Sequence, residues 1–79
     1  MKGVKDMPDK EKVGERLKRL RGHKSRAVVA SDLGVTPHAI WLWEHGLRTP
    51  RDGMKTKLAS YYRRSVSGIF YKEEYGKEK

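Results

Sequence analysis

The 79-residue sequence predicts an all-α domain with five short helices. Apolar residues recur at spacings of three and four in successive segments, which is the pattern of helices with one buried face. Helix-capping residues stand at the borders of these segments, and no stretch keeps the strict alternation that indicates a strand. A chain of this length holds a single core, so we expect the helices to form one domain.

The first helix is predicted over residues 10–21. Its apolar residues recur at i, i+4 and i+7: Val13, Leu17 and Leu20. Asp9 is a suitable N-cap and Gly22 ends the pattern. Residues 1–8 show no periodicity, and we expect them to form a flexible arm.

A second helix is expected to begin after Ser25, a good N-cap, and to end at Gly34, which can take the left-handed conformation. Its buried face comprises Val29, Ala30 and Leu33. A third helix, over about 36–45, has Thr36 as N-cap and Pro37 at its first position, where the missing N–H costs nothing. Two short helices joined by a tight turn containing glycine are typical of a helix-turn-helix.

The sequence indicates which face of the third helix is buried and where the helix ends. We assign Ile40 and Trp43 to the core, which leaves the other face outward. Gly46 is expected to end the helix, with the Leu47 side chain folding back as the apolar closure of the C-cap.

Two further helices complete the predicted domain, residues 9–71. The N-cap of the fourth is left open among Thr49, Arg51 and Asp52, and its apolar face is Met54, Leu58 and either Tyr61 or Tyr62. The fifth begins at Ser65 and has the apolar residues Val66, Ile69 and Phe70. With Tyr71 these exceed what one short helix needs for a core, so we expect weak homodimerisation there. Residues 72–79 are predicted to be a polar, flexible tail.

Charge indicates the kind of partner. The net charge is +9, with residues 1–26 at +6, residues 27–50 at −1 and residues 51–70 at +4. Two basic flanks around a nearly neutral middle favour a polyanionic partner. We expect Lys18, Lys24, Lys55, Lys57, Arg63 and Arg64 to supply long-range attraction.

Composition excludes several classes of protein. The absence of cysteine excludes disulfides, thiolate metal sites and cysteine nucleophiles. No apolar run approaches the roughly 18 residues of a membrane span, and the N-terminus lacks the apolar segment of a signal peptide, so we expect a cytoplasmic protein. No phosphate-binding glycine loop, catalytic triad or carboxylate pair is evident. We therefore expect no enzyme activity, metal, cofactor or small-molecule ligand.

A family resemblance rests on residues 25–46. Leu33-Gly34-Val35-Thr36, followed by Trp43-Glu44-His45-Gly46, resembles the Xre/Cro family, the lambda-repressor-like helix-turn-helix proteins. The match extends to Arg16–Arg21, Arg48–Pro50, Leu58-Ala59 and Val66–Phe70. It implies a compact five-helix domain whose third helix enters the DNA major groove while the second crosses the backbone. The implied function is transcriptional repression, of the phage or prophage type, from a palindromic operator bound as a dimer.

The resemblance also implies which residues meet DNA. Bases would be contacted by Pro37, His38, Trp41 and Leu42, and phosphates by Ser25, Arg26, Thr36, Arg48 and Arg51. Many family members have glutamine where this chain has Arg26, and polar residues along the reading face. Here that face has no Arg, Lys, Gln or Asn, so bidentate pairing with guanine or adenine is excluded.

Readout on this face must use other groups. We expect His38 to bind a purine edge, and Trp41 and Leu42 to meet thymine methyl groups; Trp41 could instead stack on a sugar, contact a partner or pack over a loop. His23 and His45 are expected to face solvent or lie near phosphate. The resemblance further implies an ion pair between Glu44 and Arg19 of the first helix.

Two other functions remain open from sequence. One is the DNA-binding antitoxin of a toxin–antitoxin pair, which would carry an added toxin-binding segment; the polar tail is short for that role. The other is nonspecific RNA binding, which does not explain the ordered caps at residues 33–37.

Overall fold

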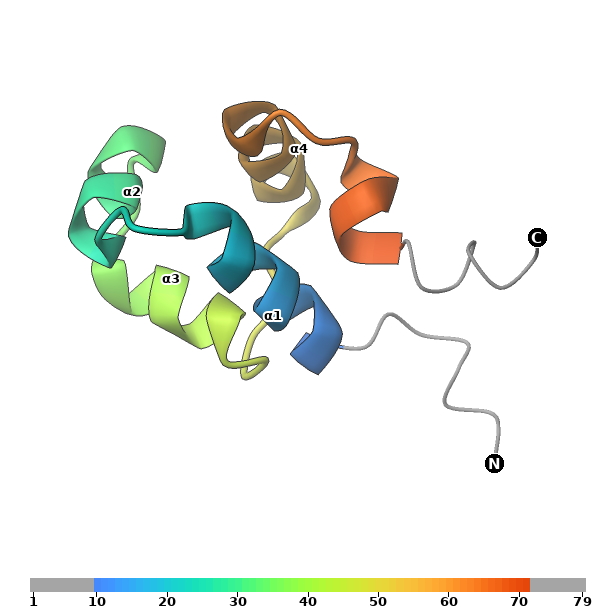
Figure 1. Cartoon of the computed structure of the whole chain (residues 1–79), viewed down its shortest axis with the longest axis horizontal. Helices are drawn as coiled ribbons and strands as arrows, with labels where there is room; N and C mark the ends of the chain where they lie inside the picture. The colour runs from blue at the N-terminus through green and yellow to red at the C-terminus, as the bar shows by residue number, and fades with distance from the viewer. Residues whose placement is uncertain (1–9, 72–79) are drawn as a thin grey trace.

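Five helical elements follow one another in residues 10–71, the part of the chain that the computed structural model describes (Figure 1). They are α1 (Lys10–Arg21), α2 (Arg26–Leu33), α3 (Pro37–Glu44), α4 (Asp52–Tyr62) and the π-helical turn η2 (Ser67–Tyr71). No strand occurs within this range. The all-α, five-helix prediction is therefore confirmed. The predicted arm 1–8, the cap at Asp9 and the tail 72–79 lie outside the described residues.

The borders of α2 and α3 follow from local chemistry. The Ser25 hydroxyl oxygen accepts a hydrogen bond from the Val28 amide at 3.1 Å, and the Thr36 hydroxyl oxygen accepts one from the Ala39 amide at 3.1 Å. Each bond satisfies an amide that the first turn of a helix leaves without a partner. Gly34 ends α2 with φ 75°, the left-handed conformation that favours glycine.

The end of α3 differs from the prediction in one respect. Gly46 has φ 70°, and the Leu47 amide donates to the Leu42 carbonyl at 3.0 Å, so the backbone makes the expected C-cap. Leu47, however, is 61% exposed as a residue, so the expected role of its side chain as an apolar closure is wrong. The loop comes close to α1 at Gly46, where an added Cβ would lie 3.2 Å from the backbone of Lys10 and Glu11.

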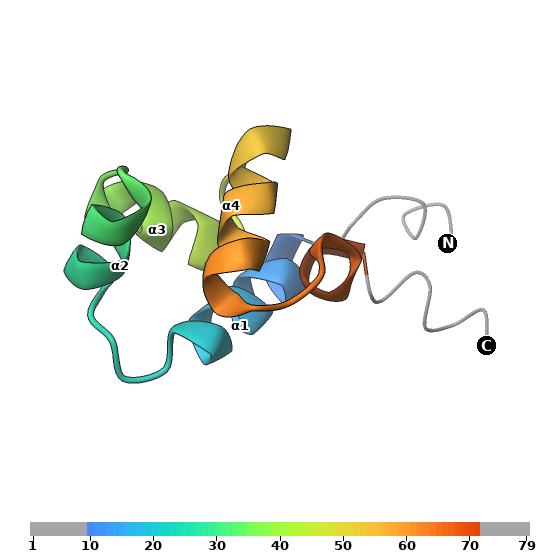
Figure 2. The same cartoon turned by 90° about the horizontal axis from the view of Figure 1, so that it is seen from above.

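One core joins all five elements. Ile40 and Trp43 are 2% and 8% exposed, which confirms the assignment of the inward face of α3. The other buried apolar residues are Val13, Leu17, Val29, Ala30, Leu33, Leu58, Ala59, Ile69 and Phe70. Helix α1 packs along α3, and α2 and α3 lie at one end of the described part of the chain while η2 lies at the other (Figures 1 and 2).

The C-terminal part of the domain is packed into the core. Ile69 and Phe70 are 1% and 2% exposed, so both belong to the core of one protomer, and the expected weak homodimerisation stays a prediction. Arg16 of α1 donates to the Ile69 carbonyl, which fastens η2 to α1. The residue before α4 is Arg51, whose side chain makes no capping bond. Tyr61 and Tyr62 are both partly buried, so α4 uses both tyrosines.

Candidate nucleic-acid interface

The starts of α2 and α3 offer polar groups to solvent. Ser25 and Thr36 are both exposed, and each uses an oxygen lone pair to cap its helix. A hydroxyl group has one hydrogen to donate as well as two lone pairs to accept with. Each cap can therefore donate to an anion while it holds its helix, and the helix dipole favours negative charge at the same place.

The outward side of α3 is organised by ring stacking. Pro37 and His38 are exposed, whereas Trp41 and Leu42 are partly buried. The Trp41 ring stacks on His45 with centroids 4.0 Å apart and on His38 with centroids 5.9 Å apart. Trp41 was expected to point outward, and this stacking accounts for its partial burial.

His45 was not among the residues expected on this face of α3. His45 is exposed, and its Nδ1 lies 2.9 Å from the Trp41 carbonyl oxygen. The spacing in the sequence could have predicted the stack of His45 on Trp41, because residues four apart on a helix lie one above the other and aromatic residues at that spacing meet.

Glu44 is a buried charged residue, and its partners differ from those expected. Its side chain is 1% exposed; Arg21 Nε and Nη2 donate to the carboxylate at 2.7 and 2.9 Å, and Arg26 Nε donates at 3.0 Å. The predicted pairing with Arg19 is wrong. Arg21 follows buried Leu17 by four residues and shares its face, whereas Arg19 follows it by two and is exposed.

The ion pair influences the titration of its surroundings. The hydrogen bond to Glu44 raises the pKa of Arg21, so its guanidinium stays charged. Burial raises the pKa of Tyr62 to about 12, and the nearby Glu44 carboxylate adds to this rise. Glu44 thus joins α3 to both α1 and the start of α2, and it holds Arg26 at the candidate interface.

The predicted phosphate-binding arginines stand in two environments. The Arg26 side chain is 31% exposed, with one nitrogen on Glu44, while Arg48 and Arg51 are exposed in the segment between α3 and α4. Three of the lysines expected to supply long-range attraction also have local partners. Lys24 and Lys55 donate to the hydroxyl groups of Tyr61 and Tyr71, and Lys57 donates to the Leu33 carbonyl at the end of α2.

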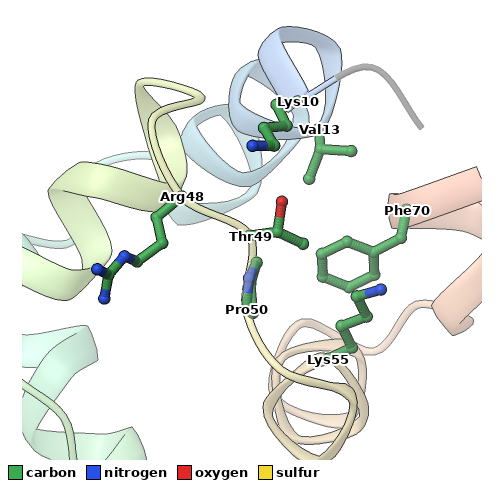
Figure 3. A pocket seen from close by; sticks show the side chains of 7 residues that line it. All are labelled: Lys10, Val13, Arg48, Thr49, Pro50, Lys55 and Phe70. Carbon is green, nitrogen blue, oxygen red and sulfur yellow. The ribbon is translucent and has the colours of Figure 1, made fainter. Parts of the chain in front are cut away.

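A hollow between α1, the segment after α3, α4 and η2 has a volume of about 20 Å³, room for about one water molecule (Figure 3). Figure 3 shows the Arg48 guanidinium pointing away from it. Its lining comprises Lys10, Val13, Arg48, Thr49, Pro50, Lys55 and Phe70.

Within residues 10–71, no three His, Asp or Glu side chains are grouped as metal ligands. None of the helices in this range is long and apolar enough to span a membrane.

Comparison with known proteins connects this geometry to transcription. No protein-family model and no curated protein matches the sequence. A solution structure of the SOS-response transcriptional repressor LexA from Eubacterium rectale is similar, with a TM-score of 0.73 and 26% sequence identity. The match covers 78% of this chain and 68% of the LexA chain. The chain therefore shares the fold of a transcriptional repressor, and its membership of the Xre/Cro family stays a prediction.

Proposed function

We propose that this protein binds double-stranded DNA sequence-specifically and regulates transcription, acting as a repressor. The observation that carries the proposal is the capped helix-turn-helix, α2 and α3, in a fold shared with a transcriptional repressor. The net charge of +9 supports it, because a basic domain is attracted to the phosphate backbone.

In this proposal α3 enters the major groove and the start of α2 lies on the backbone. Ser25, Thr36 and Arg26 bind phosphates where the two helices begin, and Arg48 and Arg51 extend the phosphate contacts beyond α3. Pro37, His38, Trp41 and Leu42 then face base edges. Glu44 fixes Arg26 through a bond of 3.0 Å, so this phosphate contact is set by the core.

A selection of bound sequences from random DNA tests the proposal. We expect one enriched motif with two-fold symmetry, because we propose that two copies bind a palindromic operator as a dimer, as in a phage-type regulator. Binding without any enriched motif would contradict sequence-specific regulation. An asymmetric motif would contradict the dimer. Tight binding of a co-expressed toxin from a neighbouring gene would favour the antitoxin function.

Salt dependence measures the phosphate contacts. With four or five phosphates neutralised per protomer, log K should fall against log salt with a slope of about −4 per protomer. Arg48→Ala should flatten that slope by about one and leave the preferred sequence unchanged. Arg48 is the cleaner test, because Arg26→Ala would also remove a partner of buried Glu44. A slope near zero for the parent protein would contradict the backbone contacts.

Base readout gives a further prediction. Trp41→Ala and His38→Ala should each cost about 1–3 kcal/mol of binding free energy on the selected operator and little on scrambled DNA. Titrations of both DNAs, after folding is verified by circular dichroism, measure the difference. Equal weakening on the two DNAs would show that the substituted residue does not read sequence.

A further inference from the structure

His45 is outside the set of residues expected to read DNA, yet it has two contacts with Trp41. The His45 ring stacks on the indole with an interplanar angle of 24°, and Nδ1 lies 2.9 Å from the Trp41 carbonyl oxygen. A carbonyl oxygen only accepts hydrogen bonds, so Nδ1–H is the donor. The bond ties the His45 ring to the backbone one turn before it.

The second imidazole completes a stack along the helix. His38 precedes Trp41 by three residues and is nearly parallel to the indole, at 10°. His45 follows Trp41 by four residues, so the two imidazoles lie one turn before and one turn after the indole. The His45 imidazole makes the closer stack, with its ring centroid 4.0 Å from that of the indole, whereas the His38 imidazole lies 5.9 Å away.

We propose that His45 is a positioning residue that determines specificity: it holds the Trp41 indole in one orientation at the major groove, where the indole reads the C5-methyl group of thymine. This inference rests on the proposed function. A methyl group is the apolar feature of the major groove, and an apolar indole held in one place suits it. Fixing the ring before binding also avoids the cost of immobilising it in the complex.

The test compares the selected operator with copies in which uracil replaces thymine at one position at a time. This change removes the methyl group and leaves the base's hydrogen-bonding groups in place. The parent should lose about fourfold in affinity at the position that Trp41 contacts. His45→Ala should bind the operator about three- to tenfold more weakly, bind scrambled DNA unchanged, and no longer distinguish thymine from uracil there.

Three further variants separate positioning from other roles. His45→Phe, which keeps a flat ring, should restore the discrimination. His23→Ala removes an exposed histidine from the turn before α2 and should leave the discrimination between thymine and uracil unchanged. In a Trp41→Ala background, His45→Ala should have no further effect on the discrimination, because the residue that it positions is absent.

Without DNA, NMR should show His45 ring protons shifted by the indole, and Trp41→Ala should abolish the shift.

Other results would overturn the inference. If His45→Ala weakens operator and scrambled DNA alike and keeps the discrimination, His45 binds phosphate and does not position Trp41. Absence of the indole-induced shift would show that the rings do not stack. If the parent enriches no sequence, the proposed function fails together with this inference. If the parent distinguishes thymine from uracil and His45→Ala does so equally well, the proposed function stands and only the inference fails.

Discussion

Gly14→Ala is expected to destabilise the domain by about 3 kcal/mol or more, although alanine is the better helix former by about 1 kcal/mol. Gly14 is buried inside α1. A Cβ there would lie 2.3 Å from the Glu44 carbonyl oxygen and 2.9 Å from that of Trp43. Both are backbone atoms of α3, so the clash is relieved only if α1 and α3 separate. Urea unfolding followed by circular dichroism measures the loss.

Gly53→Ala is the matched control. Gly53 is exposed near the start of α4, and an added Cβ would meet nothing within 4 Å. Helix propensity then acts alone, and the variant should be neutral or more stable by up to about 1 kcal/mol. If Gly14→Ala were as stable as Gly53→Ala, the close approach of α1 to α3 would be contradicted.

The features predicted correctly from sequence are those that local chemistry decides. Ser25 and Thr36 cap their helices through bonds to amides only three residues away. Gly34 adopts the left-handed conformation that a helix end requires. The spacing of Ile40 and Trp43 placed them on one face of α3, and the family resemblance indicated that this face is the inward one. The two caps and Gly34 depend on a few neighbouring residues, so the sequence pattern is sufficient for them.

The features that sequence analysis missed depend on how the helices approach one another. The resemblance pointed to Arg19 as the partner of Glu44, whereas the phase of α1 places Arg21 on the buried side. Gly14 received no role, although a glycine inside a helical pattern often marks close packing. The stack of His45 on Trp41 depends on side-chain rotamers, and the burial of Phe70 depends on where η2 docks. None of these is set within one segment.

Glu44→Gln is expected to cost about 3 kcal/mol or more of unfolding free energy, because it leaves two guanidinium groups without their counter-charge. The Arg21 side chain is only 12% exposed, so solvent compensates little for the loss. Arg21→Met should cost less than Glu44→Gln, since the carboxylate keeps its bond to Arg26 at 3.0 Å. Urea unfolding of the single variants and the double variant measures these costs.

The double variant Arg21→Met/Glu44→Gln decides whether the two groups act as a pair. Once Arg21 is absent, removing the Glu44 charge leaves only Arg26 without a counter-charge, and the Arg26 side chain is 31% exposed and can be hydrated. The double variant should therefore lose clearly less than the sum of the single losses, by about 1 kcal/mol or more. Arg19→Met, the control on the exposed side of α1, should change stability by no more than about 0.5 kcal/mol and add independently to Glu44→Gln. If the losses of unfolding free energy were additive for Arg21→Met with Glu44→Gln but not for Arg19→Met with Glu44→Gln, Arg21 would not be the partner of Glu44. The pairing of Glu44 with Arg19 that the family resemblance implies would then be correct.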